Sequence, residues 1–205
     1  MPAYPARKIE SKFTYEDYKN WPEYERWEII EGDAYAMSPA PSVFHQRSLG
    51  VIYNTLFNYL KGKTCEVFPA PIDVILPFEN KNKNKAQTVV QPDIVVVCDK
   101  NKIEDKGIFG APDFIVEILS PSSAEMDTKR KMELYEKAGV REYWIVDTSN
   151  LTLMVFMLGD NNMYSRPQFY GSRDKVNVGV FEDLQIDLRE VFGLPEEEPK
   201  SEEEE

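Results

Sequence analysis

Acidic side chains interrupt three apolar segments of this sequence. Glu117 lies inside FIVEIL, where every neighbour is apolar, Asp93 opens the segment IVVVC directly after Pro92, and Asp73 interrupts IDVIL. A buried carboxylate is costly unless it is paired with a cation or bound to a metal ion. Such acids therefore predict a cation close to these segments.

A lysine lies on the apolar face of a predicted helix. The segment 124–138 reads as a helix that ends at Gly139. At 100° per residue from Asp127, Lys131 falls at about 40°, inside the apolar arc, whereas Lys129 and Arg130 fall outside it. An ammonium group that points towards the sheet requires an anion, and the acids above are the candidates.

Each of these residues also has a purely structural interpretation. Glu117 and Lys131 form one buried ion pair in that case, without any chemistry. Asp93 then only ends a turn after proline, and Asp73 is satisfied by backbone donors. His45, the only histidine, is then a half-buried residue near a helix start.

Periodicity predicts the elements that position these groups. Residues 27–37 read as a hairpin around Glu31-Gly32-Asp33, and the segment that begins at Ser42 has the apolar spacing of a helix. Strands are expected at 66–76, 93–98, 114–119, 142–146 and 151–158, followed by further strand and turn structure up to the segment 184–192. The order predicts a mixed central sheet flanked by helices, with an N-terminal hairpin, in the α/β class.

Composition indicates one globular domain. The chain has 205 residues, of which 42% are hydrophobic and 29% charged. We expect a single domain over 1–194 and a disordered acidic tail over 195–205, because seven glutamates and one lysine give the tail half of the net charge of −12. No membrane span or export signal is visible, so a cytoplasmic location is expected. Cys65 and Cys98 are accordingly expected to be reduced core residues.

The spacing of the charged residues resembles the PD-(D/E)XK nuclease superfamily. Pro92-Asp93 is followed after 24 positions by Glu117 in an apolar strand. In that pattern a lysine follows two positions after the second acid, whereas this chain has Leu119 there. A lysine supplied by the following helix, here Lys131, is a known variation of the pattern.

A longer resemblance covers about 170 residues. The strings WEIIEGDAYAMSPAPSVFHQ, VVQPDIVVV, APDFIVEILSPSS and GVREYWIVD resemble the Uma family of restriction-endonuclease-like proteins, formerly catalogued as a domain of unknown function. The resemblance implies a restriction-endonuclease-like core. The residues that match its presumed active-site positions are Asp93, Glu117 and Lys131. The residues that match its other motifs are His45, a further catalytic candidate, with Gln46, Glu28, Gly32, Asp127 and Tyr135.

Two functions compete. The first is a Mg²⁺- or Mn²⁺-dependent endonuclease that acts on DNA, in which Asp93 and Glu117 bind the metal and Lys131 holds the attacking water. The second is a catalytically silent binding or regulatory module, which the residual negative charge and Leu119 favour. Lysines in two loops favour the first if the loops lie together: Lys81, Lys83, Lys85, Lys100, Lys102 and Lys106. A homodimer is possible, and no motif of another hydrolase class is present.

Overall fold

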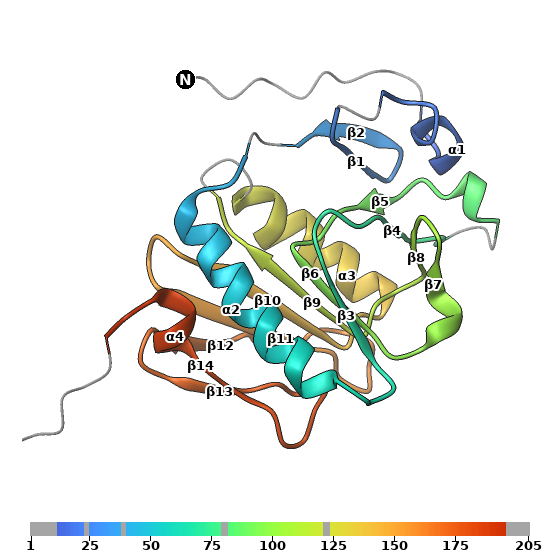
Figure 1. The fold of residues 1–205 in the computed structure, drawn as a ribbon. Coiled ribbons are helices and arrows are strands. Elements are labelled where there is room, and N and C mark those ends of the chain that lie inside the picture. Colours follow the sequence, from blue (N-terminus) through green and yellow to red (C-terminus); the bar gives the residue numbers. More distant parts are fainter. Residues whose placement is uncertain (1–11, 23–24, 38–39, 79–81, 121–123, 196–205) are drawn as a thin grey trace, which may run out of the picture.

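A six-stranded mixed sheet forms the centre of the molecule (Figure 1). The computed structural model describes residues 12–22, 25–37, 40–78, 82–120 and 124–195. The strands of the central sheet, in spatial order, are β12 (Gln168–Gly171), β11 (Thr152–Met157), β10 (Glu142–Asp147), β9 (Phe114–Ile118), β6 (Ile94–Val97) and β3 (Glu66–Pro69). Only β9 and β10 pair in parallel within it.

Helices cover both faces of the central sheet. On one face, Val116 packs into a core with helix α2 (Val43–Leu60) and helix α4 (Leu188–Phe192). On the other face, Ile115 packs with helix α3 (Met132–Ala138) and the second sheet. Every residue of β9 is buried, as expected of a strand covered on both sides. The predicted α/β architecture is therefore confirmed.

A second sheet carries the N-terminal hairpin. Its strands, in spatial order, are β2 (Asp33–Ala36), β1 (Trp27–Ile30), β5 (Val89–Val90), β4 (Val74–Ile75), β8 (Gly107–Phe109) and β7 (Ile103–Glu104). The hairpin between β1 and β2 turns at Glu31 and Gly32, which have φ angles of 50° and 82°. Two consecutive positive φ angles suit a tight hairpin turn, so this prediction is confirmed. The described elements outside the two sheets and the main helices are α1 (Tyr15–Tyr18), η1 (Lys83–Lys85), η2 (Lys100–Lys102), β13 (Lys175–Asn177) and β14 (Gln185–Asp187).

The two predicted helices form with one correction. Helix α2 begins after Ser42, whose hydroxyl accepts from the backbone N–H of His45. The second helix is not α-helical throughout, because Met126–Lys131 form a π-helix, η3, and the α-helix α3 that follows covers Met132–Ala138. Gly139 ends it with a φ of 85°, as predicted.

The strand predicted over 66–76 was wrong in its continuity. It is divided into β3, in the central sheet, and β4, in the second sheet. Pro69 and Pro71 lie at the break, and proline has no N–H group to donate to a sheet. The division sends the chain from one sheet to the other and places Asp73 between them.

The expectation of two reduced cysteines was also wrong, because Cys65 and Cys98 form a disulfide. Strands β3 and β6 pair in antiparallel register with Glu66 opposite Val97. Continuing that register by one residue sets Cys65 beside Cys98. Strand pairing between distant segments therefore decides this contact, which residue spacing does not reveal.

Residues 196–205 lie outside the described part of the chain, so the acidic tail stays a prediction. Within the described ranges, no helix has the length and apolar character needed to cross a membrane.

Candidate active site

The ammonium group of Lys131 lies among three carboxylates. Its Nζ atom is 2.9 Å from Glu28 Oε1, 3.0 Å from Glu117 Oε1 and 3.5 Å from Asp127 Oδ1. All four side chains are at least nine-tenths buried. We call these four residues the Lys131 cluster.

Three different elements build the Lys131 cluster. Glu28 comes from β1 of the second sheet and Glu117 from β9 of the central sheet, while Asp127 and Lys131 come from η3. A π-helix is rare and is frequently found at functional sites. The second sheet and η3 thus meet above the central sheet at this cluster.

Two buried tyrosines brace the cluster. The hydroxyl of Tyr135 donates to Glu117 Oε1 at 2.8 Å, and the hydroxyl of Tyr143 donates to the backbone oxygen of Asp127 at 3.0 Å. Both rings are fully buried and pack edge to face, 5.0 Å apart. Tyr135 thereby ties α3 to β9, and Tyr143 ties β10 to η3.

Burial and crowding of charge govern the protonation of the cluster. Burial, followed by the nearby carboxylates of Asp127, Asp93 and Glu28, raises the pKa of Glu117 well above its usual value, although Lys131 opposes this. For Lys131, burial alone would lower the pKa. The carboxylates of Glu117, Glu28 and Asp127 outweigh it and raise the pKa of Lys131 well above 10.5. Lys131 therefore stays protonated at neutral pH and acts as a hydrogen-bond donor.

Asp93 and His45 lie together beside the cluster. Asp93 Oδ2 accepts from the backbone N–H of Ile118 at 2.7 Å and lies 3.2 Å from Nε2 of His45. Strands β6 and β9 pair with Ile94 opposite Val116, so the same register carried one residue further sets Asp93 opposite Glu117. The side chain of Asp93 is 18% exposed, more than that of any member of the Lys131 cluster.

Gln91, which sequence reasoning did not single out, connects the Lys131 cluster to Asp73. Its backbone N–H donates to Glu28 Oε1 at 2.8 Å, and its side-chain amide donates to Asp73 Oδ1 at 2.9 Å. Tyr18 donates to the same oxygen of Asp73, so side chains rather than backbone groups satisfy this acid. Asp73 is thus a supporting residue. The polar character of Gln91, directly before Pro92-Asp93, is the one sequence signal by which this residue could have been found.

Two other groups of predicted residues do not join the cluster. Gln46 is exposed on α2, and no described side chain hydrogen-bonds to its amide group. The two lysine loops do meet, since Lys83 pairs with Glu104, but Lys102 donates to the backbone oxygen of Ala111. Lys81 lies outside the described residues. Lys83 and Lys102 therefore contact groups of the protein itself.

Asp93 and Glu117 offer carboxylate oxygens, the type of ligand that a hard divalent cation takes. The described hydrogen bonds and ion pairs of Glu117 use only Oε1, and those of Asp93 use only Oδ2. The second oxygen of each acid therefore has no hydrogen-bond donor within the described part of the chain. Mg²⁺ commonly takes one or two protein carboxylates and retains water. The described residues contain no cluster of three or more ligands with metal-site geometry.

Replacement of Glu117 by glutamine should stabilise the metal-free protein at alkaline pH. Because the folded-state pKa of Glu117 is raised, this carboxyl opposes folding progressively as the pH rises above its ordinary pKa of 4.5. Glutamine keeps an oxygen that accepts from Tyr135 and removes the charge. We expect Glu117→Gln to raise the Tm by at least about 2 °C at pH 8 in EDTA.

The gain in Tm should shrink as the pH falls towards 5, where the wild-type carboxyl takes up its proton. Thermal melts of both proteins from pH 5 to pH 8 measure this trend. A Tm difference that does not change with pH would show that the charge of Glu117 is not what opposes folding.

Comparison with known proteins fixes the family. A family model named Uma2 and described as "Putative restriction endonuclease" matches residues 15–189. The chain belongs to the Uma2 family. This match spans every residue of the Lys131 cluster, with Asp93 and His45.

Two individual proteins resemble this Uma2 chain. The "Uncharacterized protein slr1290" of Synechocystis sp. strain PCC 6803 is 26% identical over 154 residues, which cover 73% of this chain and 76% of that protein. A crystal structure described as "a putative nuclease belonging to DUF820", from Anabaena variabilis, superposes with a TM-score of 0.70 at 19% identity. The superposition covers 88% of this chain and 98% of that one and shows a shared fold. The expected nuclease-like fold is thereby confirmed.

Proposed function

We propose that this protein is a metal-dependent endonuclease that hydrolyses phosphodiester bonds in DNA. The observation that carries the proposal is the buried ammonium of Lys131, held 3.0 Å from Glu117 on a strand whose register sets Asp93 opposite that acid. Two acids on neighbouring strands with one lysine are the residue types that metal-assisted phosphodiester hydrolysis needs. Membership of the Uma2 family supports the same reaction class.

In this proposal the two acids and the lysine have different roles, which follow from their surroundings. Asp93 and Glu117 would hold Mg²⁺ or Mn²⁺ through oxygens that have no hydrogen-bond donor among the described residues. Such an ion, when bound, offsets charge on the phosphate and lowers the pKa of a water molecule. The neighbouring carboxylates keep Lys131 protonated. Its ammonium group donates hydrogen bonds to the water or to a phosphate oxygen and stabilises the negative charge that builds up on the phosphate in the transition state.

The substrate approaches from the side of Asp93 and His45. The Lys131 cluster is nearly closed to solvent, whereas Asp93 is partly exposed and His45 Nε2 contacts it. Nδ1 of His45 is buried and has no hydrogen-bond partner in the described structure. The contact of His45 Nε2 with Asp93 Oδ2 at 3.2 Å holds Asp93 in place, and the backbone of a bound strand would pass beside this pair.

The alternative is a silent binding module on the same fold. The Lys131 cluster favours it in one respect, because three carboxylates around one ammonium satisfy that cation without any substrate. Leu119, at the position where the PD-(D/E)XK pattern has lysine, favours it as well.

Incubation of supercoiled plasmid DNA with the full chain tests the proposal. We expect nicked and linear products with Mg²⁺ or Mn²⁺ and intact plasmid in EDTA. If neither cation supports cleavage of plasmid, duplex, single-stranded DNA or RNA, the nuclease proposal fails and the binding module takes its place.

A further inference from the structure

Helix α2 presents an unusual outer face. None of the 36 acidic residues of this chain lies within residues 34–65, which contain the whole helix. Three of the five large apolar side chains that are exposed in the described structure lie on α2: Val43, Phe44 and Phe57, with exposed fractions of 74%, 63% and 50%. On a chain of net charge −12, α2 itself therefore carries no acidic side chain and exposes two rings, while Asp93 contacts His45 and Asp183 accepts from Tyr59.

The exposed rings of α2 are accompanied by cations. The guanidinium of Arg47 lies over the ring of Phe44, 5.7 Å from its centre, and no described carboxylate pairs with Arg47. Lys61 caps the other end of the helix, and Phe57 stacks on Tyr53 with ring centres 5.8 Å apart. Sites that bind single-stranded nucleic acid combine aromatic rings, on which bases stack, with cationic side chains, which contact the phosphates.

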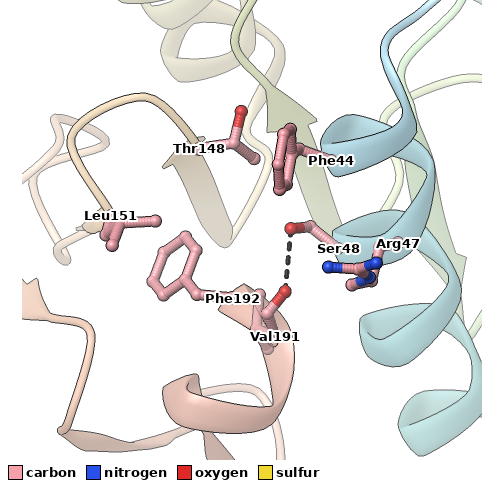
Figure 2. Close-up of a pocket in the computed structure, with 7 residues that line it drawn as sticks. All are labelled: Phe44, Arg47, Ser48, Thr148, Leu151, Val191 and Phe192. Carbon is pink, nitrogen blue, oxygen red and sulfur yellow. Dashed lines mark hydrogen bonds between the residues drawn. The ribbon is translucent and has the colours of Figure 1, made fainter. Parts of the chain in front are cut away.

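The first turn of α2 is fixed and adjoins the candidate active site. Ser48 donates to the backbone oxygen of Val191 at 2.8 Å and so anchors α2 to α4 (Figure 2). Phe44 and Arg47 border a hollow whose other lining residues include Leu151 and Phe192. His45, between Phe44 and Arg47 in the sequence, contacts Asp93. The buried side chain of His45 therefore links this turn of α2 to Asp93.

We propose that the outer face of α2 is a binding track for single-stranded DNA, on which unpaired bases stack on Phe44 and Phe57 while Arg47 and Lys61 contact phosphates. The inference deepens the proposed function and rests on it for the identity of the strand as substrate. Phe44 and Phe57 are 13 residues apart, which is about 20 Å along the helix axis and, at 100° per residue, about 140° around it, so a bound strand would cross the outer face obliquely from one ring to the other. Duplex DNA keeps its bases stacked on each other and offers no faces to these rings.

Fluorescence anisotropy with a labelled oligothymidylate and a duplex of equal length, both in EDTA, tests the track without cleavage. We expect tighter binding of the single strand than of the duplex. Phe44→Ala should weaken single-strand binding at least about fivefold, and Phe44→Trp should retain it. Arg47→Gln should lower the slope of log affinity against log salt by about 0.7.

Matched controls lie elsewhere on the surface. Phe169 on β12 is 70% exposed and Arg166 is also exposed, so Phe169→Ala and Arg166→Gln remove the same groups away from α2. Both controls should bind as the wild type does. Equal affinity of the α2 variants and the wild type, or equal affinity for duplex and single strand, would overturn the track.

Two further results separate the track from its alternatives. A dimer in analytical ultracentrifugation that Phe44→Ala dissociates would assign this face to a second copy of the chain and overturn the proposal. Loss of single-strand binding in the α2 variants, together with an inactive wild type, would support the track while the nuclease proposal fails. Cleavage of DNA by the wild type, together with normal single-strand binding by the α2 variants, would support the nuclease proposal while the track fails.

Discussion

Replacement of Lys131 by methionine should reduce metal-dependent DNA cleavage by roughly 100- to 1000-fold, the usual effect of removing one donor that stabilises transition-state charge. Methionine preserves most of the apolar stem of lysine and removes the ammonium that three carboxylates surround. Single-turnover cleavage rates at saturating cation measure the loss. A variant that cleaves as fast as the wild type would refute the assigned role of Lys131.

The same substitution should lower stability, because it leaves Glu28, Glu117 and Asp127 buried without their cation. Removal of one partner from a buried ion pair costs about 3–5 kcal/mol, and added Mg²⁺ should restore part of this if the carboxylates then share the metal. Lys129→Met is the matched control, since Lys129 lies on the same π-helix and is exposed. It should change neither the cleavage rate nor the Tm.

The double variant Asp93→Asn, Glu117→Gln should lose its affinity for Mg²⁺ and Mn²⁺. Both proposed protein ligands lose their charge in this variant, so affinity should fall by more than the roughly 10- to 100-fold that loss of an outer partner of a metal ligand costs. Isothermal titration calorimetry of each cation into the two proteins measures the change.

A second double variant controls for net charge. Asp105 and Glu133 are exposed acids outside the Lys131 cluster, and Asp105→Asn, Glu133→Gln removes the same two charges. It should bind both cations as the wild type does. Equal affinity of the Asp93 and Glu117 double variant and the wild type would remove the metal site from the account.

Charged residues within apolar segments of the sequence indicated much of the candidate site. Glu117 is surrounded by apolar residues in FIVEIL, so its need for a buried cation could be predicted without coordinates. The structure places the Lys131 ammonium beside it. The helical arc pointed Lys131 inward, although the residue lies at the end of a π-helix that no feature of the sequence distinguishes from an α-helix.

Contacts that depend on strand pairing could not be predicted in the same way. Glu28 reaches Lys131 because β1 pairs with β5 in the second sheet, and the two residues are more than 100 positions apart. The Cys65–Cys98 disulfide likewise follows from the register of β3 and β6. A compartment argument predicted reduced thiols, but chain topology brings the two sulfur atoms together.

The position of Asp93 depends partly on the local sequence and partly on strand pairing. Its place directly before an apolar strand made it a candidate, and the register of β6 and β9 sets it opposite Glu117. Its hydrogen bond from Ile118 and its contact with His45 require the packing of α2 against the end of β9, which periodicity alone does not give.

The central claim is that Glu117, Asp93 and Lys131 form one hydrolytic site. Its most direct test is the single-turnover rate of cleavage of one labelled DNA by the wild type and by Glu117→Gln at saturating Mg²⁺. Glutamine keeps the hydrogen bond from Tyr135 and the fold but removes the proposed metal-binding charge. The account predicts a rate at least about 100-fold lower for the variant, and equal rates in the two proteins would contradict it.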